Sequence, residues 1–274
     1  MKLKKKYSFT NNRQLWRLLL SESNKLIIED RDVQQKQAFF SCLQAETGKE
    51  IFRNFQPGEK FWVGIEAIYK DIIYFHKFAK PDMPGHKEII AFDILQKKVL
   101  WQVDYLSFLF VHDGLVYAFR QKFEGWEFFG LDYKTGEIIE EIGNDAPRVN
   151  SIRDSIDEME KFRGYLFPET FHEDKIEDIE IKQIIKQITE GRDVAGNIEF
   201  IEYEGLLLFN FHARVFEKSL VNRFLCVDTG TGKILFEDVL NASANAFVPD
   251  SFFMKDNLVF LLKEKTELIV CSVE

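Results

Sequence analysis

The sequence contains few of the residues that interrupt a chain or cross-link it. Its 274 residues include only 6 prolines, 15 glycines and 3 cysteines. So little proline and glycine excludes a disordered or low-complexity chain. The cysteines are far apart, odd in number and set in apolar stretches, and their spacing matches no metal site. We therefore expect Cys42, Cys226 and Cys271 to be reduced, buried thiols of a cytoplasmic protein.

Positive charge and long apolar runs are scarce as well. The net charge is −9 at pH 7, which argues against a broad basic face for nucleic acid. No run approaches the roughly 18 apolar residues of a membrane-spanning helix. The basic run at residues 2–6 reads as a solvated terminus, because TNNRQ stands where a signal peptide would carry its apolar segment. We expect a cytoplasmic monomer without a nucleic-acid or membrane partner.

Phenylalanine, in contrast, is abundant, with 28 residues beside 8 tyrosines and 4 tryptophans. Bulky aromatic side chains favour strands, and they fill the space between sheets that pack face to face. Hydrophobic residues make up 46% of the chain, which is enough for a sizeable core. The composition therefore favours an all-β protein.

One pattern recurs four times along the chain. Each copy has an alternating apolar strand, a short turn and a second alternating strand, and three copies carry an aspartate just before the turn. Aspartate accepts hydrogen bonds from the amides of a turn, and glycine supplies the positive φ that a tight turn needs. A phosphate-binding loop would need another glycine spacing and a following helix, so we interpret the pattern as a hairpin. The copies are FSCLQAETGKEIF (40–52), IIAFDILQKKVLW (89–101), FFGLDYKTGEIIE (128–140) and FLCVDTGTGKILF (224–236).

Two further apolar runs precede most of these hairpins, for example 61–71 and 72–78 before 89–101. Four antiparallel strands in about 40–50 residues form one blade of a β-propeller. The copies with aspartate resemble the repeats of quinoprotein-type β-propellers, in which Ala-Leu-Asp is followed by Thr-Gly-Lys and an apolar-apolar-Trp strand. The chain also looks like an uncharacterised intracellular bacterial propeller family. The resemblance implies a scaffold, and it implies no activity, because enzymes, assembly factors and sensors share such repeats.

We predict a single β-propeller domain over residues 1–274, with about six four-stranded blades and five as the alternative. NNRQLW (11–16) aligns with TGKILF, so we expect this strand to complete the last blade, with Trp16 beside Val270. Such a ring leaves no exposed sheet edge. Residues 144–195 are expected to be a degenerate blade or a helical insertion, with helical spacing over 151–162 and 174–191. The other blades are placed at 17–56, 61–104, 105–143, 196–239 and 244–274.

The residues that could carry chemistry are scattered. The five histidines match no metal-ligand spacing, and CxxC, HExxH and GxSxG motifs are missing. His76 and His212 occupy corresponding strands, where a local hydrogen bond is expected to satisfy each of them. A pyrroloquinoline quinone enzyme would need a calcium site, and no oxygen-ligand cluster such as DxDxDG occurs. We therefore assign no catalytic, metal-binding or cofactor-binding residue, and we expect no cofactor.

Four residues remain as candidates for a binding face. Trp62 and Trp126 open strands, where they could stack on a sugar or peptide or simply pack between blades. His86 lies in the expected loop KPDMPGHKE (80–88), and His172 lies beside Glu173 in a polar loop. These features favour a non-catalytic binding or interaction module with a protein or small-molecule partner. The alternative is a small-molecule hydrolase or lyase with polar residues at the mouth of a central channel, where clustered pKa shifts would mark the site.

Overall fold

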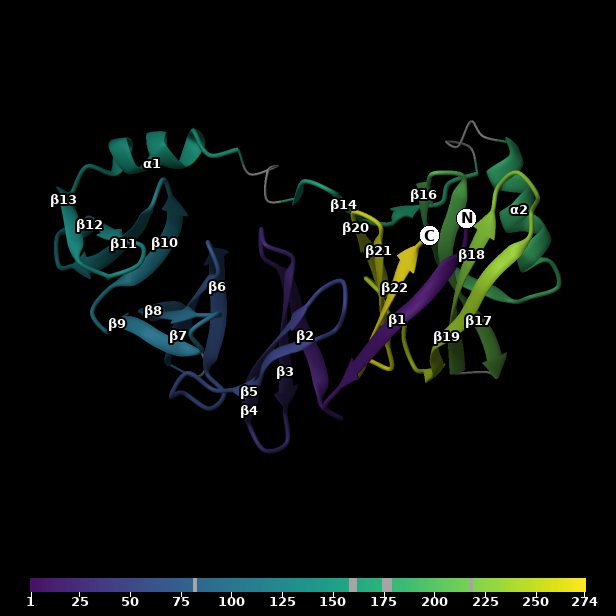
Figure 1. The fold of residues 1–274 in the computed structure, drawn as a ribbon, viewed down its shortest axis with the longest axis horizontal. Helices are drawn as coiled ribbons and strands as arrows, with labels where there is room; N and C mark the ends of the chain where they lie inside the picture. The colour runs from purple at the N-terminus through teal and green to yellow at the C-terminus, as the bar shows by residue number, and fades with distance from the viewer. Residues whose placement is uncertain (81–82, 158–161, 174–178, 217–218) are drawn as a thin grey trace. The chain divides into compact units, whose positions relative to one another are not determined.

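A computed structural model describes the chain except for residues 81–82, 158–161, 174–178 and 217–218. The chain divides into two compact units, one formed by residues 13–161 and the other by residues 1–12 together with 162–274. Each unit has its own antiparallel sheets and its own apolar core (Figure 1). The mostly β composition predicted from the sequence is confirmed.

The unit formed by residues 13–161 contains three four-stranded antiparallel sheets and one helix among its described residues. Within each sheet the strands pair in chain order, as a series of hairpins requires. The first sheet is β2 (Gln14–Leu20), β3 (Lys25–Asp32), β4 (Gln37–Gln44) and β5 (Glu50–Phe55); the second is β6 (Val63–Tyr69), β7 (Ile72–Lys80), β8 (Met83–Asp93) and β9 (Lys98–Val103); the third is β10 (Ser107–His112), β11 (Leu115–Lys122), β12 (Gly125–Asp132) and β13 (Ile138–Gly143), followed by α1 (Ala146–Asp154).

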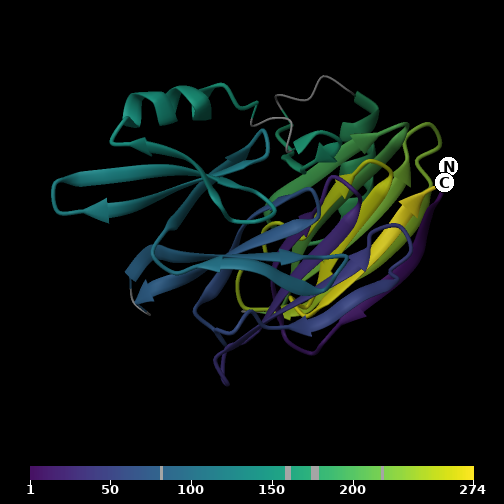
Figure 2. The ribbon, with the colours of Figure 1, turned by 60° about the vertical axis from the view of Figure 1, so that its left-hand side comes forward.

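The second unit contains two five-stranded sheets, each built from four long or medium strands and one two-residue strand. The two chain ends meet in one of these sheets, where Lys2 N donates to Glu274 O at 2.9 Å (Figure 2). That sheet is β1 (Leu3–Thr10), β22 (Glu267–Val273), β21 (Leu258–Lys263), β20 (Phe252–Lys255) and β14 (Tyr165–Leu166); the other is β15 (Glu169–Thr170), β16 (Val194–Tyr203), β17 (Leu206–Phe216), β18 (Ser219–Asp228) and β19 (Ile234–Ala244), with α2 (Ile179–Thr189) against it.

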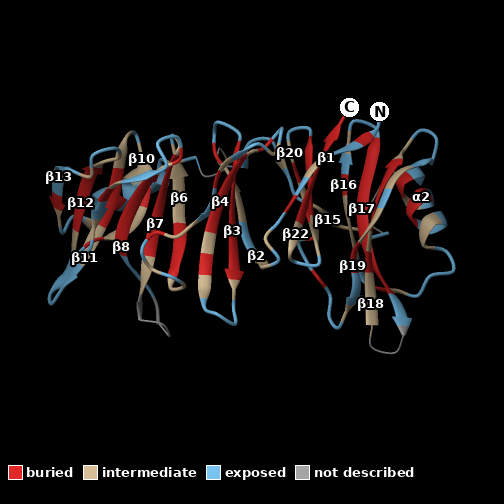
Figure 3. Ribbon diagram, turned by 60° about the horizontal axis from the view of Figure 1, so that its bottom comes forward, coloured by how far each residue is buried: buried red, intermediate tan, exposed pale blue. Residues whose placement is uncertain are grey.

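Consecutive sheets within a unit pack face to face, and the buried residues lie along the middle of the strands (Figure 3). Between the first two sheets of the first unit, Phe40 and Phe75 meet edge to face with ring centroids 4.7 Å apart. The same arrangement in the second unit places Phe224 against Phe252 at 5.0 Å. Burying a Phe side chain contributes about 1.5–3 kcal/mol, so the phenylalanine-rich strands hold the sheets together as blade-like layers.

The hairpin interpretation of the repeated pattern is confirmed. Asp228 Oδ1 accepts the amide of Thr231 at 2.8 Å, and Asp132 Oδ1 accepts the amide of Thr135 at 2.7 Å. Gly232 and Gly136 follow with φ of +68° and +73°. Asp93 Oδ1 accepts two turn amides at 2.8 Å in the same way. Three aspartates that the sequence aligned therefore share one structural role.

The strand that pairs with β22 is β1, and the prediction that residues 11–16 fill this place is wrong. Tyr7 stands opposite Val270, whereas residues 14–20 pair with β3. The lysines of the basic run are solvated, as expected, but the run belongs to β1 and is not a free terminus, because Leu3 and Phe9 are buried in the core. Trp16 is 56% exposed. Polar residues followed by apolar ones occur in both β1 and β2, so this pattern did not distinguish the true partner of β22 from its neighbour in the sequence.

The described residues form five sheets, and a sixth is not among them. Residues 144–195 carry α1, α2 and the short strands β14 and β15, which extend two existing sheets. The helix expected over 151–162 begins earlier, because Asp145 caps it by accepting the amide of Arg148 at 3.0 Å, and it ends at Asp154. Residues 158–161 of the expected helix lie outside the described residues. Part of the helix expected over 174–191 lies outside the described residues. Ring closure and a single domain stay predictions.

All three cysteines are buried, as expected. Burial raises the pKa of the Cys42 and Cys226 thiols to about 12 and that of Cys271 to about 11. They are therefore uncharged at neutral pH and act as small apolar groups. Among the described residues, no helix has both the length and the apolar character needed to cross a membrane.

Gly136 and Gly232 hold equivalent positions in two of the aspartate turns, and they test how the sheets pack. Gly232→Ala is expected to lower the free energy of unfolding by about 1–2 kcal/mol, because of its positive φ. Gly136→Ala should cost more, because its Cβ would lie 2.6 Å from Cδ2 of Trp101 on the neighbouring sheet. Urea denaturation of both variants measures the difference. Equal losses would show that the Trp101 ring does not lie against this turn.

The pairing of β1 gives a second prediction. Phe9→Ala should destabilise the second unit by about 3–5 kcal/mol, because a buried Phe leaves a cavity. Trp16→Ala should cost less than about 1 kcal/mol, because the ring is largely exposed and contacts Arg31 at 5.0 Å. Urea unfolding followed by circular dichroism compares them. A larger loss for Trp16→Ala would restore residues 11–16 as the strand that completes the last sheet.

Candidate functional site

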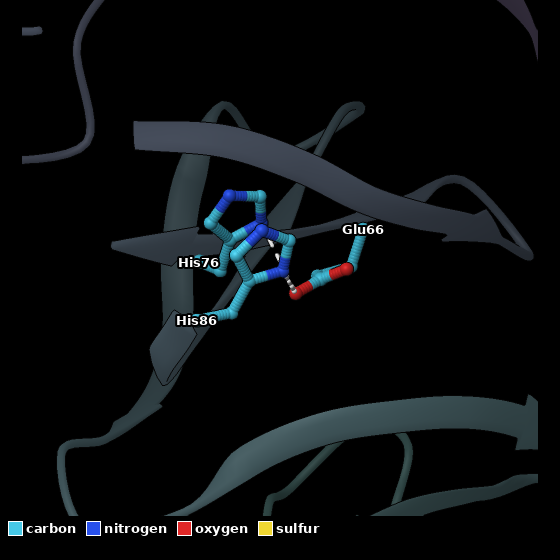
Figure 4. A group of neighbouring side chains, drawn as sticks. All are labelled: Glu66, His76 and His86. Atoms are coloured by element: carbon cyan, nitrogen blue, oxygen red, sulfur yellow. Dashed lines mark hydrogen bonds and ion pairs between the residues drawn. The ribbon is translucent and has the colours of Figure 1, made fainter. Parts of the chain in front are cut away.

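Three polar side chains meet on one face of the second sheet (Figure 4). Glu66 comes from β6, His76 from β7 and His86 from β8. In the register, His86 stands opposite Phe78, and residues two apart on a strand share a face, so His76 and His86 lie on the same side. Glu66 is the extra residue of a β-bulge between Ile65 and Ala67, and bulges redirect side chains in this way.

A glycine makes room for the buried imidazole. Gly64 stands opposite His76 across β6 and β7. A Cβ at Gly64 would lie 2.8 Å from Cε1 and 3.0 Å from Nε2 of His76. The His76 ring therefore lies over the bare backbone of β6, a position that any larger residue would block.

One carboxylate oxygen faces both imidazoles. Glu66 Oε1 lies 2.8 Å from Nδ1 of His86 and 3.1 Å from Nδ1 of His76. The two rings are stacked, with centroids 3.5 Å apart and planes inclined by 8°. The cluster of Glu66, His76 and His86 is thus a compact group with a single shared acceptor.

The three members differ in their access to solvent. His76 is 5% exposed, whereas the side chain of Glu66 is 15% and that of His86 is 38% exposed. The 3.1 Å approach of His76 to Glu66 lacks the alignment of a hydrogen bond, and neither ring nitrogen of His76 has a hydrogen-bond partner in the described part of the chain. A buried polar group left without a partner costs about 1–3 kcal/mol. The cluster therefore has unused bonding capacity next to a solvent-facing histidine.

The charge of Glu66 follows from its neighbours. Burial raises the pKa of its carboxyl group, but His76 and His86 lower it by more, so the pKa lies below its ordinary value. Glu66 is therefore an anion at neutral pH. A carboxylate beside two imidazoles is able to bind a cation or to orient a histidine for proton transfer.

Two arginines fix the strand that carries Glu66. Arg31 Nη2 donates to the carbonyl of Val63 at 2.7 Å, and Arg17 Nη1 donates to that of Ile65 at 2.6 Å. Arg31 also pairs with the buried Glu29 at 2.6 Å. Burial raises the pKa of Glu29 despite the opposing effect of Arg31. These contacts hold β6 on both sides of Gly64, which keeps the slot for His76 in place.

The residue types of the cluster are those that ligate metal ions. One ligand atom from each of the three lies within 4.8 Å of the others. The expectation that no residue ligates a metal was based on spacing along the chain. Spacing along the chain does not show which residues are neighbours on adjacent strands, so it did not bring Glu66 and His76 together with His86. Counting back from the turn at residues 70–71 pairs Glu66 with Phe75, on the other face from His76, so the cluster depends on the bulge at Glu66, which counting does not show.

The predicted binding-face residues separate into three places. His86 belongs to the cluster, and it lies in strand β8 instead of the expected loop. Trp62 reaches the cluster through Phe78, whose ring meets Trp62 at 6.2 Å and His86 at 5.3 Å, edge to face. Trp126 packs on Phe119 in the third sheet at 4.5 Å. His172 is exposed in the other unit, between β15 and α2.

The two histidines that the sequence aligned behave differently. His212 Nε2 accepts the amide of Val248 at 3.1 Å, which confirms the expected local hydrogen bond. Burial lowers the pKa of His212. For His76 the same expectation is wrong, because both of its ring nitrogens lack such a bond within the described residues. Of the two histidines, His76 is therefore the one whose ring nitrogens could still accept or donate a bond.

The matching family model covers residues 20–101 and describes a domain of unknown function, DUF4905. This stretch includes all three residues of the cluster. A comparison with curated protein sequences finds no match.

Three solved structures are similar to this chain at 11% identity. An uncharacterised protein of Listeria monocytogenes EGD-e has a TM-score of 0.36, with 92% of this chain and 76% of that protein covered. A europium-containing methanol dehydrogenase has 0.34, with 96% and 52% covered. A bifunctional GH43-CE protein of Bacteroides eggerthii has 0.28, with 99% and 34% covered. The chain thus spans about half and about a third of the last two proteins, and these scores are too low to assign its chemistry.

The glycine slot gives a prediction for the site. Gly64→Ala should lower the free energy of unfolding by about 1–3 kcal/mol, because the new methyl group displaces the buried His76 ring. Gly130→Ala is the matched control, since its Cβ would meet only ordinary contacts at 3.5 Å. Urea denaturation, together with the NMR shifts of the His76 ring protons, measures both effects. Unchanged ring shifts in Gly64→Ala would contradict the close approach.

Proposed function

We propose that the chain is a non-catalytic binding module that takes up its ligand at the cluster of Glu66, His76 and His86. The observation that carries the proposal is the buried imidazole of His76, which lacks a hydrogen bond in the described residues although an anionic carboxylate and a partly exposed histidine lie beside it. Buried polar atoms that lack hydrogen bonds and lie next to solvent are more typical of a binding site than of a protein core.

The proposal extends to the architecture. In this proposal the five sheets are blades of a quinoprotein-type β-propeller. The protein acts as a cytoplasmic monomer without nucleic-acid or membrane partners. The repeated aspartate turns and the face-to-face packing of consecutive sheets support this scaffold. A rigid sheet positions a site more accurately than a loop does, which suits residues from three adjacent strands.

A second candidate function is hydrolysis or elimination on a small molecule. It is favoured by the 2.8 Å contact between Nδ1 of His86 and the anionic Glu66, since a carboxylate that orients a histidine is a common acid–base pair. A hydrolase of this kind should cleave simple activated esters, and His86→Ala should abolish that activity. If the chain is a binding module instead, neither the wild-type protein nor His86→Ala should hydrolyse these esters.

Thermal unfolding tests the binding proposal. Tag-free protein is measured with chlorides of Zn²⁺, Co²⁺, Ni²⁺, Mg²⁺ and Ca²⁺, and with sodium acetate, citrate and phosphate. At least one probe should raise the melting temperature, because a ligand at 100 times its Kd stabilises the folded state by about 2.7 kcal/mol. His86→Ala should remove the shift without unfolding the protein, since this side chain is partly exposed.

The matched control is His112→Ala in the same unit. His112 is a partly exposed strand histidine that faces Asp113 at 3.3 Å, and it is not a member of the cluster. This variant should keep the full shift. The proposal is wrong if no probe stabilises the protein, or if His86→Ala and wild type respond alike.

A further inference from the structure

We infer that the ligand of this cluster is a divalent transition metal ion of the zinc class, held by Glu66, His76 and His86. This inference rests on the proposed function, that the cluster binds a ligand, and it names the chemical class. The identity of the donor atoms, the distances between them and the ability of the His86 imidazole to turn support it.

The donor set selects the class of ion. Two imidazole nitrogens and one carboxylate oxygen suit zinc, cobalt, nickel and copper, whereas calcium and magnesium prefer sets made of oxygen alone. Glu66 supplies one negative charge, so the complex keeps a net positive charge that a bound water or a small anion can balance. Two imidazoles and one carboxylate are also the protein ligands of several zinc sites.

The spacing is close to what an ion needs. Ligand atoms at about 2.0–2.1 Å from a tetrahedral zinc ion lie about 3.3 Å from one another. Glu66 Oε1 is 2.8 Å from Nδ1 of His86 and 3.1 Å from Nδ1 of His76. These two distances are therefore within about half an ångström of the ligand spacing around zinc.

One ring must turn. Lone pairs of imidazole nitrogens lie in the ring plane, so two parallel rings 3.5 Å apart cannot both point at one ion. His76 is held in the slot over Gly64, and it is almost completely buried. His86 is 38% exposed and lies at the edge of the cluster. Metal binding therefore requires His86 to leave the stack while His76 and Glu66 stay in place.

The surroundings support a fixed pair and a movable partner. The carbonyl contacts of Arg31 and Arg17 hold β6 next to Glu66, as outer contacts commonly do around metal ligands. At His86, the 2.8 Å hydrogen bond from Ser107 Oγ to the His86 carbonyl holds the backbone. That bond is made by the backbone, so the imidazole can turn away from Glu66 and His76 without breaking it.

Cobalt absorption and NMR test the inference on the full-length, tag-free protein. Co²⁺ should bind with one-to-one stoichiometry and give visible d–d bands, and Zn²⁺ should displace it. Mg²⁺ and Ca²⁺ should leave the spectrum unchanged. Binding of Zn²⁺ should also shift the ring protons of both histidines, because the mutual ring current of the stack is lost.

Ligand variants locate the site. Glu66→Gln and His86→Ala should each weaken Co²⁺ binding tenfold or more, and His112→Ala should leave the Kd unchanged. Circular dichroism verifies that the variants are folded. Glu66→Gln keeps the shape of the side chain and removes its charge, so a loss of binding there reflects ligation and not packing.

The outcomes separate this inference from the proposed function. If only acetate, citrate or phosphate stabilises the protein and His86→Ala removes the effect, the cluster binds an anion and the metal inference is wrong while the binding module stands. If Co²⁺ binds equally to wild type and to both ligand variants, the ion is bound elsewhere and the inference is overturned. If no probe binds at all, both proposals are wrong.

Discussion

Burial of apolar side chains between consecutive sheets is the interaction on which this structure depends. A four-stranded sheet has two faces, and it is stable only when its apolar face is covered. In the unit of residues 13–161, the second sheet is covered on one side by the first and on the other by the third. Phe40, Phe75 and Phe92 fill the first of these layers, which explains why phenylalanine is so frequent in the strands.

The candidate site lies on the other face of the second sheet, because Gly64 and His76 alternate with the residues of β6 and β7 that face the first sheet. Glu29 and Arg31 on β3 are buried, and Arg31 reaches across to the carbonyl of Val63 on the next sheet. Charges at such depth are tolerated only when they are paired, and removing one partner leaves the other as an uncompensated buried charge with a large desolvation cost. The same close packing that positions β6 therefore holds the slot of His76, so the geometry of the cluster is inherited from the contact between two sheets.

How much of this could be inferred from the sequence depends on the range of the interactions involved. The aspartate turns are local, because Asp132 and Gly136 are four residues apart and determine the turn together, and so they were predicted correctly. The choice between residues 3–10 and 11–16 as the partner of β22 depends on a pairing across the whole chain. Residues 11–16 were chosen because they align with TGKILF, and this local likeness says nothing about which strand lies beside one at the other end of the chain. The cluster was missed for a related reason, since Glu66, His76 and His86 lie ten residues apart and meet only through strand register and a bulge.

The pairing of β1 with β22 also has a consequence for how the protein is made. Leu3 stands opposite Val273, and nearly the entire chain is synthesised between these two partners. The entropy lost when so long a loop closes, and the general slowness of distant pairings, make this a late step of folding. During translation the first strand has buried side chains but no sheet to join. A growing chain must therefore keep these apolar side chains from aggregating until residues 267–273 have left the ribosome.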